Sequence, residues 1–380
     1  MPVPPTEDAD RRAPPSTASG AGGLGALPGR AASLVWSAAS RLHRTLGTRS
    51  RAVRGRPACA VVSVGGLTVG GAGKTPTAAA VARGLHARGL RVVLASRGYG
   101  GSHRDPVTVV SDGRHVRAHA ERSGDESLVL AAHAPGVPVL VGRDRRIVGH
   151  RAVSGFEADV LVLDDGFQHH GLARDFDLVC VDGVAGLGNG RVLPAGPLRE
   201  PRSALRGADA LLVLDLEAGA TPSDPRERFG IAKFVGPDVP VFRGRRTPTA
   251  LVPLGGGEPI APTSLAGREV GLLAGIARPE SFRRSLEALG ARVVAERIFP
   301  DHHAYRERDF GPGRGGEGLS AKVHWVTTEK DGYKILPRWL PGTRTSVLRM
   351  TLEIDEAERL SASIVDRIAP RLARLGGPRP

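Results

Sequence analysis

Short apolar runs that alternate with helical or loop segments dominate the sequence from residue 58 onward. The runs are almost continuous in apolar residues, which is typical of strands in a parallel sheet that is covered on both faces. Because helical or loop segments separate successive strands, the pattern predicts an α/β fold. The predicted strands of this first series cover residues 58–64, 91–96, 137–141, 160–163, 178–181 and 210–214.

A second α/β series follows a stretch rich in Pro, Gly and Arg at residues 236–268. We interpret this stretch as a linker region that contains short strands at 239–242 and 250–254. A chain of 380 residues is long enough for two domains, so we expect the second series to form a smaller α/β domain at 269–380. Its predicted strands and helices cover residues 270–276, 279–289, 292–299, 324–327, 346–353 and 355–375.

The N-terminal segment differs from both series. Residues 1–26 are rich in Pro, Ala, Gly and Ser and show no periodicity, which predicts a disordered tail. Residues 27–56 are predicted to form a basic amphipathic helix, over 31–46, and a connector. Such a helix either packs on the folded domain or lies in a membrane interface with its arginines near anionic headgroups. Its apolar stripe consists of Val35, Ala39, Leu42 and Leu46.

The charge of the chain has three interpretations. It carries 53 basic and 39 acidic side chains, a formal net charge of +14, and seven arginines with no acid fall within 27–56. Compositional bias toward arginine, an anionic membrane surface and nucleic acid all account for such an excess. The nucleic-acid interpretation rests on net charge alone, because three Trp and three Tyr give few stacking platforms and no recognition motif is present. We therefore expect no nucleic-acid partner.

Composition excludes three further classes. An apolar content of 41% excludes a wholly disordered chain, and no apolar run approaches the ~18–20 residues that span a bilayer. Two cysteines, Cys59 and Cys180, cannot form a disulfide framework or a cysteine-rich zinc site. Both lie in apolar runs, so we expect buried thiols in a cytosolic chain.

The first predicted strand leads into a glycine-rich loop and then into an alanine-rich helix. The loop ends in Gly-Lys-Thr, the arrangement of a phosphate-binding loop, although Thr68 stands where the strict motif has glycine. Backbone N–H groups surround phosphate oxygens, Lys74 reaches the β- and γ-phosphates, and the Thr75 hydroxyl binds Mg²⁺. The residues predicted to bind the nucleotide are Thr68, Val69, Gly70, Gly71, Ala72, Gly73, Lys74, Thr75 and Pro76.

The strand predicted at 160–163 ends in Asp164 and Asp165. This position places two carboxylates at the carboxyl edge of the sheet, beside the phosphate-binding loop. Such a Walker-B arrangement holds Mg²⁺ directly or through water. The predicted metal site therefore consists of Thr75, Asp164 and Asp165.

Two further polar clusters leave alternatives open. Asp125 begins a predicted helix, where an acid either complements the helix dipole or acts as a general base. Asp301, His302 and His303 follow a strand of the second series and form either a catalytic dyad or a turn. The sequence does not decide which of the two histidines acts.

Taken in order, these motifs resemble the tetraacyldisaccharide 4′-kinase family of the lipid A pathway. The resemblance covers roughly residues 58–355. It is most specific in the Asp-Asp-Gly-Phe-Gln-His block at 164–169 and in the segment from Gly-Asn-Gly-Arg to Arg-Glu-Pro at 188–201. Other segments that carry it are 68–76, 96–100, 124–126, 141–145, 299–303 and 327–331.

The resemblance implies an ATP-dependent enzyme that phosphorylates the 4′-hydroxyl of an acylated glucosamine disaccharide 1-phosphate. It implies a P-loop NTPase-type domain with a mostly parallel sheet at 57–235, joined by a β-ribbon to the second α/β domain, with ATP between them. It also implies a peripheral enzyme at the cytoplasmic face of the bacterial inner membrane. The family's N-terminal helix docks on the membrane, which favours an anionic membrane surface as the partner of 27–56.

The resemblance also assigns roles to residues. Asp125 matches the general base and His302 its partner, while Lys74 and Mg²⁺ would stabilise the transferred phosphoryl group. Asp164 and Asp165 match the carboxylates that are linked to Mg²⁺, and Asp165 is counted among the catalytic residues. The positions that match substrate-binding residues are Gln168, Arg199 and Glu200.

Departures from the family pattern occur at Gly66, Ser127 and the Gly-rich stretch 311–318, and none removes a catalytic group.

A regulatory NTPase at the membrane is the alternative function, since such proteins also combine this loop with membrane helices. It requires a guanine-specific Asn-Lys-x-Asp motif after a late strand. The segment 328–331 lacks that spacing.

Overall fold

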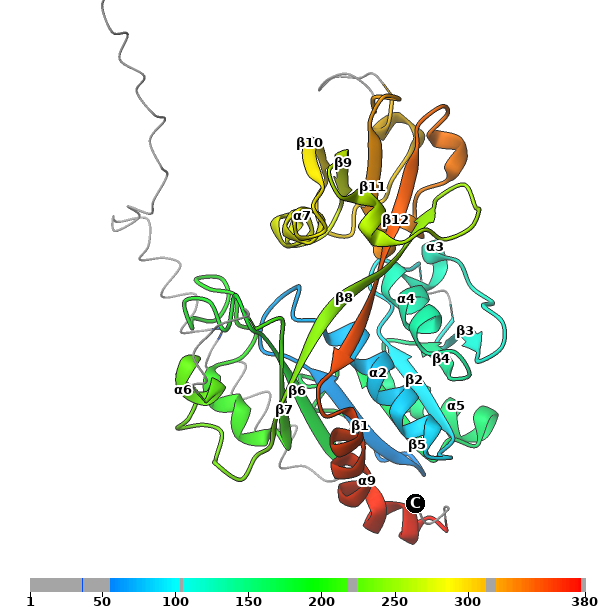
Figure 1. Cartoon of the computed structure of the whole chain (residues 1–380). Coiled ribbons are helices and arrows are strands. Elements are labelled where there is room, and N and C mark those ends of the chain that lie inside the picture. The colour runs from blue at the N-terminus through cyan, green and yellow to red at the C-terminus, as the bar shows by residue number, and fades with distance from the viewer. Residues whose placement is uncertain (1–35, 37–54, 103–104, 217–223, 312–318, 377–380) are drawn as a thin grey trace, which may run out of the picture.

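One continuous sheet of twelve strands organises the part of the chain that the structure describes, in the order β10-β9-β11-β12-β8-β7-β6-β1-β5-β2-β4-β3 (Figure 1). The predicted tail at 1–26 and the predicted helix at 31–46 lie outside this part, except for Trp36, which is helical. Among the described residues, no helix has the length and apolar character needed to cross a membrane. The computed structural model describes residues 36, 55–102, 105–216, 224–311 and 319–376.

The first domain extends from β1 to α6. Its strands are parallel except for β3, an edge strand antiparallel to β4 that the sequence did not predict because Thr108 and Ser111 interrupt its apolar run. The strands are β1 (Ala60–Gly65), β2 (Val92–Ser96), β3 (Thr108–Asp112), β4 (Pro138–Val141), β5 (Val160–Asp164), β6 (Phe176–Asp182) and β7 (Ala210–Leu214). The helices are α2 (Lys74–Ala87), α3 (Ala120–Ser123), α4 (Asp125–His133), α5 (Arg145–Phe156) and α6 (Pro225–Arg228).

The second domain lies above the first in Figure 1 and is built on three parallel strands. These are β9 (Glu269–Ala274), β10 (Arg292–Ile298) and β11 (His324–Thr328), with helices α7 (Pro279–Ala288) and α8 (Glu329–Gly332). The remaining elements are β8 (Val241–Pro253), β12 (Thr345–Ile354) and α9 (Ala357–Arg374).

Alternate side chains of the central strands pack into two cores, one on each face of the sheet. In β1, Ala60, Val62 and Val64 lie in a core with α2, α4 and α9. Val61, and Cys59 just before the strand, lie in a core with α5. Every residue of β1 is buried. The parallel sheet covered on both faces, predicted from the apolar runs, is therefore confirmed.

An antiparallel ribbon of β8 and β12 connects the two domains (Figure 1). At its start β8 pairs in parallel with β7, where Val241 lies opposite Leu211. Further along it pairs with β12, where Pro253 lies opposite Ser346. The two short strands expected at 239–242 and 250–254 thus belong to one strand of 13 residues. This ribbon is the linker that the family resemblance implies.

The C-terminal helix α9 packs on the first domain, against α2, β1 and β6. Its Leu360, Ile364 and Ile368 lie in the same core as β1, and the Arg371 guanidinium donates to the Pro57 carbonyl at 2.7 Å. The sequence predicts 269–380 as the second domain, and here the structure corrects the boundary. The chain returns to the first domain after β12 because the apolar stripe of α9 covers a face of the sheet that is otherwise exposed.

Shortening a buried side chain of α9 tests whether the helix stabilises the first domain. Ile364 is fully buried, so Ile364→Ala is expected to lower the free energy of unfolding by about 2–5 kcal/mol through lost burial and a residual cavity. Urea denaturation measures the change. The control is Asp366→Ala, an exposed position of the same helix, and equal effects of the two variants would contradict the packing.

Candidate active site

The loop between β1 and α2 has the backbone of a phosphate-binding loop. Gly70, Gly71 and Gly73 have φ angles of 71°, 55° and 69°, a region that a side chain disfavours. The side chain of Leu214 fills the space that a Cβ on Gly73 would occupy. Because α2 begins at Lys74, the N-terminus of the helix opens directly onto the loop, where its N–H groups attract phosphate.

Asp164 and Thr75 provide oxygen atoms for a divalent cation. The Thr75 hydroxyl donates to Asp164 Oδ2 at 3.1 Å, and Asp164 Oδ1 is buried without a hydrogen-bond partner. Burial, followed by the charges of Glu126 and Asp165, raises the pKa of Asp164 to about 7. A cation would favour the ionised form and satisfy the orphaned oxygen, so these residues fit Mg²⁺.

The described residues contain no group of three or more His, Cys, Asp or Glu side chains placed to hold a metal ion. A cation at Asp164 and Thr75 would therefore need phosphate and water oxygens to complete its shell. That is the usual mode of Mg²⁺ binding beside a nucleotide.

The Asp165 carboxylate lies between two positively charged side chains. Its carboxylate is 3.4 Å from Lys74 Nζ and 2.5 Å from Arg199 Nη1. Burial alone raises the pKa of Asp165, but Lys74 and Arg199 outweigh it and lower the pKa below its usual value. Asp165 therefore remains ionised and holds both side chains beside the loop.

Asp125 is the first residue of α4 and is 4% exposed. Its carboxylate is 3.4 Å from His302 Nδ1 and 3.1 Å from Lys334 Nζ, both from the second domain. Burial raises the pKa of Asp125, yet the contact with His302 and the charges of Lys330 and Lys334 lower it well below the usual range. The same contact raises the pKa of His302.

His302, rather than His303, is the histidine that faces Asp125. It lies in the left-handed region with φ of 58°, and its ring stacks on Tyr99 with centroids 6.0 Å apart. His303 instead contacts Asp309 at 2.9 Å and stacks on Phe299.

Two side-chain contacts between α8 and α4 hold the second domain against the first. Lys330 Nζ donates to Glu126 Oε1 at 2.6 Å, and His133 contacts Glu329 at 2.9 Å. Sequence reasoning did not assign Lys330 or Lys334 to the site. The available signal was their rarity, since the chain has only five lysines and these two lie in or beside a family segment.

The three predicted substrate-binding residues lie around the loop. Gln168 Nε2 donates to the Gly66 carbonyl at 2.9 Å, just before the loop. Glu200 is 4% exposed and contacts His170 at 3.1 Å. Arg199 holds Asp165, and its backbone N–H donates to the Leu67 carbonyl at 2.8 Å. All three side chains are therefore engaged with the protein in this structure.

The remaining loop residues are tied to the segment before Arg199. Thr68 forms an antiparallel bridge with Leu198, and the Val69 N–H donates to the Pro197 carbonyl at 2.9 Å. Thr68 is 5% exposed, so the departure from glycine at this position is accommodated in the backbone pairing.

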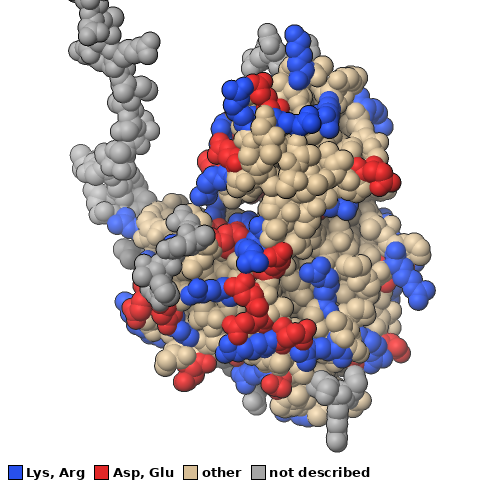
Figure 2. Space-filling model, in the orientation of Figure 1, with Lys and Arg blue, Asp and Glu red and all other residues tan. Residues whose placement is uncertain are grey.

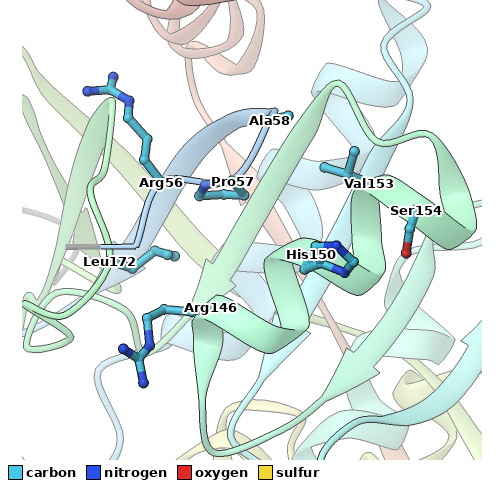
Figure 3. A pocket seen from close by; sticks show the side chains of 8 residues that line it. All are labelled: Arg56, Pro57, Ala58, Arg146, His150, Val153, Ser154 and Leu172. Carbon is cyan, nitrogen blue, oxygen red and sulfur yellow. The ribbon is translucent and has the colours of Figure 1, made fainter. Parts of the chain in front are cut away.

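A cavity of about 370 Å³ lies elsewhere in the first domain (Figure 3). Arg56, Arg146 and His150 contribute to its lining, and the two arginines pair with aspartates. None of its lining residues belongs to the phosphate-binding loop or to the acids beside it. The cavity is therefore separate from the candidate active site.

Comparisons with known proteins agree on one family. A family model described as tetraacyldisaccharide-1-P 4′-kinase (LpxK) matches residues 27–369. A tetraacyldisaccharide 4′-kinase of Anaeromyxobacter dehalogenans (strain 2CP-C) is 43% identical over 338 residues, which are 88% of this chain and 89% of that protein. The Geobacter sulfurreducens protein of the same name is 42% identical over 286 residues, 74% of this chain and 77% of its own.

A solved structure extends the similarity to the fold. The crystal structure of LpxK from Aquifex aeolicus in complex with ATP aligns with a TM-score of 0.68 at 28% sequence identity. The alignment covers 90% of this chain and 98% of that chain.

Removing one positive neighbour tests the electrostatics at Asp125. In Lys334→Met the pKa of Asp125 is expected to rise, because burial of the carboxylate is then opposed by fewer positive charges. Titration of aspartate ¹³C carboxyl shifts measures the change. Lys322→Met, at an exposed lysine, serves as the control. An unchanged Asp125 pKa in Lys334→Met would contradict the contact.

Proposed function

The chain belongs to the tetraacyldisaccharide-1-P 4′-kinase family, and on that premise we propose which residues carry out each part of its reaction. It is an ATP-dependent kinase of lipid A biosynthesis that acts on a lipid disaccharide. One observation carries the assignment of roles: the second domain contacts both the phosphate-binding loop, through Ala277 and Arg278, and Asp125, through His302. The regulatory NTPase is set aside, since the family match spans 27–369.

The loop binds ATP, Thr75 and Asp164 hold its cation, and Asp165 orients Lys74. The loop N–H groups, the N-terminus of α2 and Lys74 bind the phosphates. Thr75 and Asp164 hold Mg²⁺, which when bound neutralises charge on the β- and γ-phosphates. Asp165 orients Lys74 through their 3.4 Å ion pair, so the ammonium stays directed at the transferred group.

Asp125 acts as the general base toward the 4′-hydroxyl. The hydroxyl proton passes to the carboxylate, a bond forms between the 4′-oxygen and the γ-phosphorus, and the bond from that phosphorus to the bridging oxygen breaks as ADP leaves. Asp125 is suited to this role because its contacts with His302 and Lys334 keep it ionised. Those contacts also fix the direction in which its oxygen atoms face.

The lowered pKa of Asp125 suits a loose transition state. In such a state the acceptor hydroxyl loses its proton late, so the first task of the carboxylate is to orient the hydroxyl by accepting its hydrogen bond. His302 lies 3.4 Å away, and the same contact raises its pKa, which favours the protonated imidazole that keeps Asp125 ionised and oriented.

The predicted substrate-binding residues Gln168, Arg199 and Glu200 surround the loop. Arg199 supplies a positive charge beside Asp165 and the phosphate-binding loop, which suits an anionic acceptor. Gln168 and Glu200 support this region through Gly66 and His170. Their proposed part in substrate binding is to position the backbone of Arg199 and of the phosphate-binding loop.

A peripheral position on the cytoplasmic face of the inner membrane completes the proposal. The substrate is a lipid, and residues 27–56 carry seven arginines with no acid, which suits an anionic surface. Within that segment the Trp36 indole donates to the Arg199 carbonyl at 2.9 Å and is 46% exposed. The segment proposed to bind the membrane is therefore connected to the proposed acceptor site.

A kinase assay with ATP, Mg²⁺ and the disaccharide 1-phosphate in detergent tests the assigned roles. Asp125→Asn and Lys74→Ala are each expected to lower kcat by ~10²-fold or more. Asp125→Asn removes the proton acceptor, and Lys74→Ala removes the positive charge that stabilises the transferred phosphoryl group. Lys322→Ala is the control for loss of a lysine. Near-normal turnover of either variant, with an unchanged circular dichroism spectrum, would reject the role assigned to that residue.

Sedimentation with vesicles tests the membrane proposal. The wild-type chain is expected to bind vesicles that contain anionic phospholipid and not purely zwitterionic ones. Replacing arginines of 27–56 by Gln, at Arg41, Arg44, Arg49 and Arg51, is expected to abolish that binding. The control has the same net charge and replaces four exposed arginines elsewhere, Arg114, Arg308, Arg338 and Arg344. Equal loss in both variants would show that general charge, and not this segment, drives binding.

A further inference from the structure

Two residues of the second domain lie directly on the phosphate-binding loop. Ala277 and Arg278 follow β9, and Arg278 immediately precedes α7. A Cβ placed on Gly70 would be 2.9 Å from Ala277 Cβ, and one placed on Gly71 would be 2.8 Å from Arg278 Nε. The guanidinium of Arg278 is therefore in contact with the turn whose N–H groups are proposed to bind phosphate.

Asp182 holds the Arg278 guanidinium in this position. It is the last residue of β6 and is 5% exposed. Its Oδ2 accepts from Arg278 Nη1 at 2.8 Å, and its Oδ1 accepts from the N–H groups of Val184 and Ala185 at 3.1 and 2.7 Å. One oxygen thus stabilises the turn after β6, while the other binds the arginine. Figure 2 shows basic and acidic side chains gathered where the two domains meet.

We propose that Arg278 binds the phosphates of ATP from the second domain, and that Asp182 competes with ATP for the same guanidinium. The proposal rests on the nucleotide site of the proposed function. A guanidinium has five N–H donors in a planar fork that matches phosphate oxygens, and it stays protonated when partly buried. Because a polyphosphate is a stronger anionic partner than one carboxylate, ATP in the loop draws Arg278 from Asp182.

This arrangement couples ATP binding to the placement of the second domain. Arg278 and His302 are both in the second domain, on loops that follow β9 and β10. When Arg278 contacts ATP, the loop that carries it is held on the first domain, and with it the domain that places His302 beside Asp125. Arg278 is thus a residue that positions the nucleotide and the second domain together.

The competing explanation is that the Arg278–Asp182 ion pair only fastens the two domains together. The two explanations predict different effects of an Asp182 substitution on ATP binding. If Arg278 only fastens the domains through Asp182, removing either partner weakens ATP binding. If Arg278 binds ATP and Asp182 competes, Arg278→Ala weakens binding whereas Asp182→Asn does not. Asp182→Asn keeps the turn, because the remaining carbonyl oxygen still accepts the N–H groups of Val184 and Ala185. Arg246, which lies 4.0 Å from Asp182 Oδ2, keeps its closer ion pair with Asp215.

The measurement is the Kd of a non-hydrolysable ATP analogue with Mg²⁺, determined by calorimetry on the full chain. Arg278→Ala is expected to raise the Kd about tenfold and Arg278→Lys to raise it less, since the charge is kept without the fork. Asp182→Asn is expected to bind at least as tightly as the wild type. An unchanged Kd in Arg278→Ala, or a weaker Kd in Asp182→Asn, overturns the proposal.

Two controls isolate the phosphate contact. Arg283→Ala removes an arginine of α7 that pairs with Glu287 and Glu296, and it is expected to leave the Kd unchanged. Adenosine carries no phosphate, so its binding is expected to be equal in the wild type and in Arg278→Ala. A tenfold effect on adenosine would overturn the proposal.

The test separates this proposal from the proposed function because it needs no lipid. A wild-type chain that binds the analogue but does not phosphorylate the disaccharide would refute the function and leave the Arg278 test standing. An Arg278→Ala variant that binds the analogue as the wild type does would refute the Arg278 contact and leave the function standing.

Discussion

The buried carboxylate of Asp125 depends on charges that its own domain does not supply. Burial favours the protonated acid, which could neither orient nor deprotonate a hydroxyl. His302, Lys330 and Lys334 reverse that preference, and all three are in the second domain. The second domain therefore keeps Asp125 ionised, which is the state that its proposed role as general base requires.

The ribbon of β8 and β12 determines how that contact is made. In the ribbon, β8 pairs with β7 of the first domain and β12 pairs with β11 of the second, and the two strands pair with each other. The backbone hydrogen bonds of the ribbon resist sliding of one domain along the other. Side-chain ion pairs such as Lys330 with Glu126 then fix the approach of α8 to α4. The ribbon thus limits the relative positions of the domains, and the ion pairs select one of them.

Sequence patterns predicted the parts of the site that local rules govern. The Gly-Lys-Thr loop and the acids after β5 follow from the order strand, loop, helix, because parallel strands end at one edge of a sheet. The pairing of Asp125 with His302 came from the family resemblance, since 177 residues separate them (302 − 125). Lys334 and Arg278 were not predicted, because their positions depend on how the second domain packs. The return of α9 was missed for the same reason.

The placement of α9 gives the second domain the character of an insertion. The chain leaves the first domain along β8, builds the second domain, and comes back along β12 to end in a helix on the first domain's own core. Both strands of the crossing lie side by side, so everything between Leu254 and Arg344 is a module with adjacent entry and exit. Changes within that module can alter the residues that it places at the site, such as Arg278 and His302, while the core around β1 and α2 keeps its packing. Such an architecture lets the second domain's contribution to the site change without loss of the first domain's core.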